Sequence, residues 1–413
     1  MIGKIIHDYS KLQRPIVMLI IAELFLQLIN TSFTLILNIY MLKQGYTDSQ
    51  VADFVSYRYI GVLLFALPLG LIIKGRKLKP FFYFAAISIP LCSLLILYAT
   101  ENRLDPLLHF GLFFWGIAFT CIQITVLPYI LRNAKEETYS EAISLNHATW
   151  SIGTIASGLL IYFLSGISFF SGNEKIMLEI FSVIGLFSIL FIYLMKDSEK
   201  IPDLETKRRD LRAFDWTIIL KALAPTLIIA VGAGLTIPFI NLFFYNVFHM
   251  DSGHFSMMGS ISAILVTIGA LFIPQIKKKY GYSVAIIFTQ SMAVAALIML
   301  AATEFFSAYP IALYVAITCY LFRQPLMNMA GPITSELIMD YVGKRNHEML
   351  SALSSAVWSG SWYISSRIFK SLRENGFHYS GIFFITALLY IIGVLWYQML
   401  IRDYHKKLRT TDM

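Results

Sequence analysis

Long apolar segments, separated by short polar stretches, recur along this chain from Pro15 to Ile401. A helix needs about 20 mostly apolar residues to cross the roughly 30 Å hydrocarbon core of a bilayer. Only 14% of the 413 residues are charged, against about 25% in ordinary soluble domains. The chain is therefore predicted to be an all-α polytopic membrane protein.

Charged and helix-breaking stretches divide the apolar sequence into twelve predicted transmembrane helices. The first apolar run is too long for the core of a signal peptide and lacks a small-residue cleavage site, so we expect it to remain as the first helix. The predicted helices lie at residues 15–42, 51–73, 81–99, 107–131, 140–165, 175–195, 217–247, 255–276, 283–303, 310–338, 347–369 and 379–401.

The distribution of positive charge predicts the orientation of these helices. An even number of crossings places both termini on the same side of the membrane. Most of the 33 lysines and arginines fall in the tails and loops on that side, and few, such as Lys43 and Arg103, fall in the opposite loops. Because cytoplasmic loops carry the excess of positive charge, both termini are predicted to be cytoplasmic. Short loops and the lack of targeting segments favour a multi-pass protein of a bacterial inner (plasma) membrane.

A charged stretch at residues 196–214 separates the first six predicted helices from the last six. It is predicted to be a cytoplasmic linker between an N-terminal six-helix bundle, residues 1–195, and a C-terminal six-helix bundle, residues 215–413.

Several features recur about 205 positions apart in the two bundles, which is the mark of an internal repeat. Pro128 late in the fourth helix matches Pro332 late in the tenth. Glu141 followed by Trp150 matches Glu348 followed by Trp358. The common offset predicts two pseudo-symmetric halves that arose by duplication of a six-helix unit.

Two parallel six-helix repeats with a midplane binding site at their interface form one large class of secondary transporters. On this architecture, and over essentially its whole length, the chain resembles the major facilitator superfamily. The family's signature after the second helix is matched in part: Gly70 is followed by apolar residues, but Lys74 stands where the family has Asp. The second-half counterpart, Lys277 to Gly281, is also basic and also lacks the acid, so the family's charge latch between the halves is not carried over.

The resemblance implies a carrier that works by rocking of its two halves. The family's drug antiporters have a Gly-Pro motif in the fifth helix, whereas this chain has Gly153 to Gly158 without proline. Drug-proton antiport is therefore disfavoured.

The first helix carries a polar stripe that cannot face lipid. Glu23, Gln27, Asn30, Thr34 and Asn38 share one face at the helical period, so we expect them to line a cavity. An ionisable group at membrane depth is a functional candidate, and Glu23 is the candidate for proton coupling. The alternative is a carboxylate that is bonded to neighbouring helices or open to the cytoplasmic vestibule.

Arginine and aromatic residues supply the other candidates for substrate binding. On the tenth helix Tyr320, Arg323 and Gln324 share a face, and the permanent charge of Arg323 needs an anionic or aromatic partner. A bound anion is one such partner, and an ion pair with Glu23 or Glu336 is another. Arg58 in the second helix is a candidate for attracting anions at the outer mouth. The remaining candidates are Gln123, His147, Trp150, Asn241, Tyr245, Trp358 and Trp362.

Helices five, seven and eleven also admit purely structural interpretations. Small hydroxyl side chains in helices five and eleven allow close helix packing, and Pro238 in the seventh helix allows a bend.

The predicted function is secondary active transport of a small organic solute by alternating access. The solute is anionic or zwitterionic if it contacts Arg323, and transport is proton-coupled if Glu23 titrates. The alternative is a multidrug or lipid-like exporter on the same scaffold.

A membrane-embedded transferase needs interfacial carboxylates or histidines, and the loop group His249, Asp251 and His254 is the only candidate. The sequence also lacks a phosphate-binding loop for ATP-driven pumping. We therefore predict no enzymatic activity, no catalytic residue and no metal ion or other cofactor. The protein is also predicted to have no nucleic-acid partner and to act as a monomer in the lipid bilayer.

Overall fold

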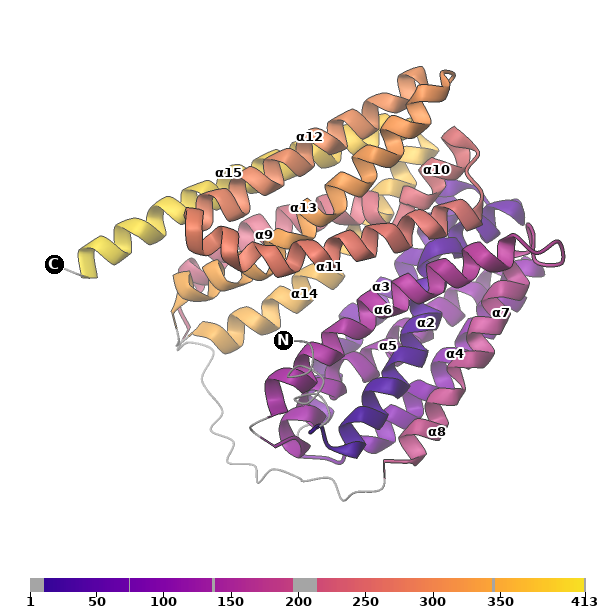
Figure 1. Ribbon diagram of the computed structural model, residues 1–413, viewed down its shortest axis with the longest axis horizontal. Coiled ribbons are helices and arrows are strands. Elements are labelled where there is room, and N and C mark those ends of the chain that lie inside the picture. Colours follow the sequence, from indigo (N-terminus) through magenta and orange to yellow (C-terminus); the bar gives the residue numbers. More distant parts are fainter. Residues whose placement is uncertain (1–10, 74, 136–137, 196–213, 344–345, 412–413) are drawn as a thin grey trace. The chain divides into compact units, whose positions relative to one another are not determined.

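The computed structural model describes residues 11–73, 75–135, 138–195, 214–343 and 346–411 (Figure 1). These residues form helices and short connections and contain no strand, which confirms the all-α prediction. Ten of the described helical segments are long and apolar enough to cross a membrane. The predicted linker at 196–214 lies outside the described residues, apart from Phe214.

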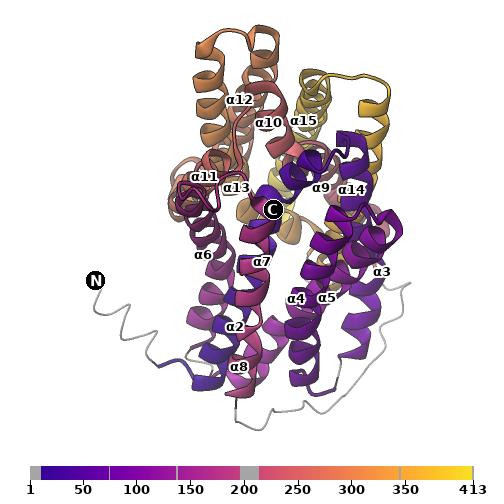
Figure 2. The ribbon, with the colours of Figure 1, turned by 90° about the vertical axis from the view of Figure 1, so that its right-hand side faces the viewer.

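The described residues divide into two compact units. In the first unit α2 packs on α6, α7 and α8, and α5 packs on α3 and α4 (Figure 2). Residues Asp251–Ser260 also belong to this unit. Its helices are α2 (Arg14–Lys43), α3 (Asp48–Ile72), α4 (Lys79–Glu101), α5 (Asp105–Asn133), α6 (Tyr139–Ser165), α7 (Glu174–Gly185) and α8 (Phe187–Tyr193).

In the second unit α9 packs on α14 and α15, and α12 packs on α13 and α15. The helix α11 (Ser252–Tyr282) is divided, because its residues from Ile261 onward belong to this second unit. The other elements are α9 (Trp216–Thr236), η3 (Ile237–Phe239), α10 (Ile240–Phe248), η4 (Ser283–Phe288), α12 (Thr289–Ala302), η5 (Thr303–Phe306), α13 (Pro310–Val342), α14 (His347–Glu374) and α15 (Tyr379–Thr411).

Local chemistry explains where the helices differ from the prediction. The helix α3 begins earlier than expected because Thr47 and Gln50 form a capping box. The seventh predicted helix is interrupted by a 3₁₀ turn around Pro238, a residue that lacks the N–H needed for helical hydrogen bonding. The basic stretch at 277–279, expected in a loop, lies inside α11, because the chain turns only at Gly281, whose φ of 76° suits glycine.

The predicted repeat is reflected in one helix contact that occurs once in each unit. In the first unit the Ser157 hydroxyl donates to the Leu28 carbonyl oxygen at 3.1 Å, which joins α6 to α2. In the second unit the Ser365 hydroxyl donates to the Val231 carbonyl oxygen at 2.7 Å, which joins α14 to α9. Small residues let membrane helices approach closely, so these two hydroxyls serve packing within each unit.

Candidate functional site

A buried polar cluster runs across α2, α3 and α6 of the first unit. The side chains of Glu23, Gln27 and Asn30 are at most 3% exposed. Asn30 donates to Gln27 Oε1 at 3.0 Å and accepts from Nη2 of Arg58 at 2.5 Å. Gln27 and Thr149 lie beside the carboxyl group of Glu23. We call Glu23, Gln27, Asn30 and Arg58 the α2 cluster, and its polar side chains connect a carboxyl group to a guanidinium.

The carboxyl end of the α2 cluster has unsatisfied hydrogen-bonding groups. Within the described residues, Oε2 of Glu23 and Nε2 of Gln27 have no hydrogen-bond partner, and no lysine or arginine of the unit pairs with Glu23. A buried polar atom without a partner costs about 1–3 kcal/mol, and an unpaired charge at membrane depth costs more. Proton binding to Glu23 removes this charge.

The guanidinium end of the α2 cluster is held by aromatic rings. The Cζ atom of Arg58 lies 4.4 Å from the ring centroid of Trp115 and 5.8 Å from that of Phe119, both on α5. Because α3 begins at Asp48, Arg58 lies about 15 Å along the helix. Each cation–π contact contributes about 0.5–2 kcal/mol, and no carboxylate among the described residues of the unit contacts this arginine.

The other predicted binding residues of the first unit have exposed side chains. Thr34 is exposed, although its hydroxyl donates to the Asn30 carbonyl oxygen at 2.8 Å. Gln123, His147 and Trp150 are also exposed. Exposed side chains of a membrane helix face lipid or a water-filled opening, so their role in substrate binding stays a prediction.

In the second unit, Arg323 of α13 is fully buried, and its guanidinium is hydrogen-bonded to neutral side chains. Its Nη1 donates to Gln324 Oε1 at 3.1 Å and its Nη2 donates to the hydroxyl of Tyr390 at 3.0 Å. Within the described residues its Nε has no hydrogen-bond partner. The proposed ion pair with Glu336 is absent from this unit, since Glu336 binds Lys277 of α11 instead.

A cavity of about 230 Å³ adjoins the partners of Arg323 in the second unit. It brings together two predicted residues, Gln324 and Trp358, with two that sequence reasoning missed, Gln290 and Tyr390. A single tyrosine or glutamine within an apolar helix gives no periodic signal, so these two were not singled out. The other polar lining residues are Thr226, Asn328, Thr334, Ser335, Ser354 and Tyr397.

The remaining second-unit candidates lie apart from the lining of this cavity. Tyr320 is buried beside Ser262 and Gln324. Asn241 is buried, and its Oδ1 accepts from the backbone N–H of Leu242 at 2.9 Å. Tyr245 and Trp362 are half-buried. Their role as substrate ligands stays a prediction.

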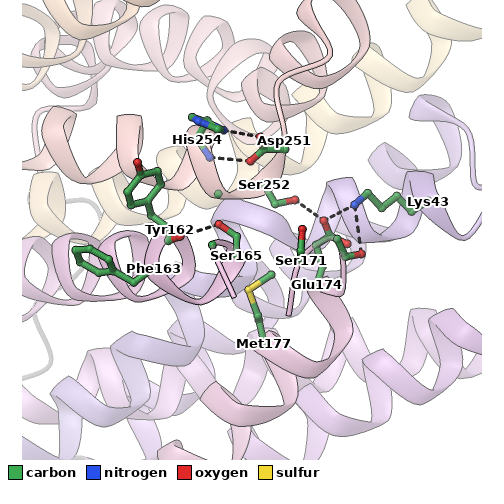
Figure 3. A pocket seen from close by; sticks show the side chains of 13 residues that line it. Lys43, Tyr162, Phe163, Ser165, Ser171, Glu174, Met177, Asp251, Ser252 and His254 are labelled. Atoms are coloured by element: carbon green, nitrogen blue, oxygen red, sulfur yellow. Dashed lines mark hydrogen bonds and ion pairs between the residues drawn. The ribbon is translucent and has the colours of Figure 1, made fainter. Parts of the chain in front are cut away.

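A second cavity, of about 540 Å³, lies in the first unit where α2 ends and α7 and α11 begin (Figure 3). Glu174 is 2% exposed and accepts from Lys43 at 2.5 Å and from the Ser252 hydroxyl at 2.7 Å. The sequence placed Lys43 in a loop and gave no sign of this ion pair, because no local pattern links two residues so far apart in the chain.

Two residues of the predicted loop group lie at the same cavity. Asp251 and His254 are hydrogen-bonded to each other at 2.5 Å. Burial raises the pKa of the Asp251 carboxyl group, but the backbone and ring hydrogen bonds from His254 and its charge outweigh burial, so the pKa lies below its ordinary value. His249 ends α10 in a left-handed conformation with φ of 52° and does not line this cavity.

Comparison with known proteins agrees with this architecture. The structure is similar to a D-xylose-proton symporter, with a TM-score of 0.73, 14% sequence identity, and coverage of 93% of this chain and 96% of that one. It is similar to the POT family transporter PepTSo, with a TM-score of 0.74, 11% identity, and coverage of 95% and 98%. It is also similar to the nucleoside transporter NupG, with a TM-score of 0.68, 14% identity, and coverage of 94% and 99%.

At such identities these likenesses show the fold alone. No curated protein matches the sequence. The sequence itself matches the Major Facilitator Superfamily over residues 19–366, which is most of the chain. The chain belongs to the major facilitator superfamily.

Proposed function

We propose that this protein is a secondary active transporter that moves a small organic anion or zwitterion by alternating access, coupled to protons through Glu23. Its family and its fold indicate a multi-pass membrane transporter; the substrate class and the coupling ion are the proposal. The proposal includes a monomer in the plasma membrane with both termini cytoplasmic.

The buried carboxyl group of Glu23 carries the proposal of proton coupling. It is 3% exposed, and among the described residues of its unit it has an oxygen without a hydrogen-bond partner and no lysine or arginine as a salt-bridge partner. A structural carboxylate in a membrane is normally paired or fully hydrogen-bonded. A carboxyl group that lacks both is suited to exchange a proton when alternating access opens it to water.

The balance of charge in the second unit supports an acidic solute. Arg323 is always charged, it is fully buried, and its guanidinium donates hydrogen bonds to the neutral side chains of Gln324 and Tyr390. These two side chains line the 230 Å³ cavity. The positive charge of Arg323 therefore favours an acidic or zwitterionic solute over a cationic one.

Transport assays in proteoliposomes test the proposal. Solutes that raise the apparent melting temperature of the purified protein in detergent are offered to proteoliposomes that contain a trapped pH-sensitive dye. We expect uptake of an acidic solute to be accompanied by proton entry and to be accelerated by an inward proton gradient.

The matched variants are Glu23→Gln and Glu179→Gln. Glu179 lies on α7, its side chain is 39% exposed and its ion pair with Lys175 is long at 3.6 Å, so its replacement is expected to leave coupling intact. Glu23→Gln is expected to abolish the response to the proton gradient while solute exchange across the membrane continues. Gradient-driven uptake that survives in Glu23→Gln would exclude this residue as the coupling group. Uptake of diverse apolar cations would instead indicate the multidrug alternative.

A further inference from the structure

We infer that Arg58 is the residue that directly binds the acidic group, a carboxylate or a phosphate, of the transported solute. This inference rests on the proposed function and deepens it by assigning the solute's charge to a site in the first unit.

The hydrogen-bonding capacity of Arg58 is largely unused. A guanidinium has five N–H donors, and within the described residues only one hydrogen bond forms, from Nη2 to Oδ1 of Asn30. The other contacts of the guanidinium are with aromatic rings, chiefly those of Trp115 and Phe119. Rings stabilise the charge but accept no strong hydrogen bond. The side chain is partly exposed, so a ligand can reach the remaining donors.

Arg323 differs from Arg58 in each of these respects. It is 0% exposed, its two terminal nitrogens already donate to Gln324 and Tyr390, and it does not line the cavity that these two residues share. Arg323 is therefore a positioning residue that acts through Gln324 and Tyr390. Arg58 is the arginine whose geometry suits direct contact with a ligand.

The chemistry of the site selects an oxyanion. A planar guanidinium forms two parallel hydrogen bonds with a carboxylate or a phosphate. The buried rings of Trp115 and Phe119 hold the guanidinium and keep its surroundings poor in water, which strengthens attraction for an anion. A neutral or cationic group would leave the charge of Arg58 without compensation.

The α2 cluster provides a physical link between this anion site and the proton site. The amide of Asn30 contacts Arg58 through its oxygen and Gln27 through its nitrogen, and Gln27 lies beside Glu23. An anion that engages Arg58 changes the hydrogen bonding of Asn30 and, through Gln27, the surroundings of Glu23. Anion binding at Arg58 and proton binding at Glu23 are therefore expected to be coupled through the side chains of Asn30 and Gln27.

The test is ligand-induced thermal stabilisation of the full-length chain in detergent. The probes are acetate, succinate, citrate and inorganic phosphate. Each is compared with sodium chloride at equal ionic strength, so that the general screening of charges by salt is the same in both samples. We expect at least one of these anions to raise the apparent melting temperature of the wild type. Arg58→Gln is expected to abolish the rise, whereas the exposed loop variant Arg103→Gln, which also removes one positive charge, is expected to keep it.

Two further variants keep the test decisive if Arg58→Gln does not fold. Arg58→Lys retains the charge but not the planar fork, so it is expected to weaken anion binding at least about tenfold. Arg323→Gln is expected to reduce binding but not abolish it. Equal stabilisation of the wild type and either Arg58 variant, or no stabilisation of the wild type by any of the four anions, would overturn the assignment.

A phosphate could also come from a lipid head group, and the same measurement distinguishes that source. The wild type is compared in phosphatidylcholine nanodiscs with and without phosphatidylglycerol. Stabilisation that requires phosphatidylglycerol and disappears in Arg58→Gln would assign the site to lipid and overturn the solute assignment. Proton-coupled uptake of an acidic solute that is unchanged in Arg58→Gln would leave the transporter proposal standing without this site. Anion binding through Arg58 without any transport would leave the site standing without the transporter.

Discussion

Replacing Lys43 by methionine is expected to destabilise the first unit strongly. The change leaves the Glu174 carboxylate, which is 2% exposed, with the Ser252 hydroxyl but without a cation. Removing one partner of a buried ion pair costs about 3–5 kcal/mol. Because the Lys43 side chain is 30% exposed, water offsets part of this cost, and we expect about 2–3 kcal/mol. For a unit of roughly 200 residues this corresponds to a fall in apparent melting temperature of about 4–12 °C.

The native cysteines provide the assay. The chain has three cysteines; Cys121 and Cys319 are buried and Cys92 is half-buried. A thiol-reactive fluorogenic dye therefore reports their exposure as the purified protein is heated at one rate in detergent. In a Cys319→Ser background only Cys92 and Cys121, both in the first unit, react, so the signal follows the unit that contains the ion pair.

Three matched variants isolate the interaction. Lys175→Met removes the cation of an exposed pair with Glu101 and is expected to cost no more than about 1 kcal/mol. Glu174→Gln with Lys43→Met removes both charges and is expected to recover at least half of the loss in a double-mutant cycle. If Lys43→Met lowers the melting temperature no more than Lys175→Met, or if the double variant recovers nothing, the ion pair does not stabilise the unit as argued.

Two further predictions concern packing and hydrogen bonding. The Cys319→Ser background measures the first, in the first unit, and a background that keeps Cys319 but lacks Cys92 and Cys121 measures the second, in the second unit. Gly158→Ala would place a Cβ atom 2.1 Å from the Ser260 hydroxyl oxygen and is expected to lower the free energy of unfolding by about 1–3 kcal/mol. Gly70→Ala, where a Cβ atom would meet nothing within 4 Å, is expected to be neutral or slightly stabilising. Equal effects of the two variants would refute the argument from close contact. Tyr390→Phe removes a hydrogen bond to a buried guanidinium and is expected to cost about 1.5–3 kcal/mol, against about 1 kcal/mol for Tyr397→Phe, which removes a hydrogen bond between neutral hydroxyls. A larger loss in Tyr397→Phe would contradict this order.

The sequence predicted the segments of the fold because hydropathy and helical period are local properties. Apolar runs of membrane length gave twelve expected crossings, and the described helices begin within a few residues of the expected starts. The ends differ more, since α11 runs to Tyr282 and α15 to Thr411, beyond the expected ends at 276 and 401. Specific local interactions also override average hydropathy, as at the capping box of Thr47, which extends α3, and the interruption around Pro238.

The sequence also predicted which face of the first helix is polar. Glu23, Gln27 and Asn30 were placed together because residues three and four positions apart share a helical face, and the structure shows them buried in one cluster. The same argument does not extend beyond the helix, because the shared face of one helix does not name the residues of other helices that contact it. The structure turns the side chain of Arg58 toward α2 and α5, where Asn30 and Trp115 contact it.

The sequence by itself thus determined that the chain is an all-helical membrane protein with a polar stripe on its first helix, because these features depend on composition and on spacing within one helix. The tertiary structure alone decided the partners of the charged side chains. Arg58 meets Asn30 of α2, Arg323 meets Tyr390 of α15, and Lys43 meets Glu174 of α7. A contact between helices depends on the rotation and depth of both, which close packing sets and which spacing along one helix does not encode.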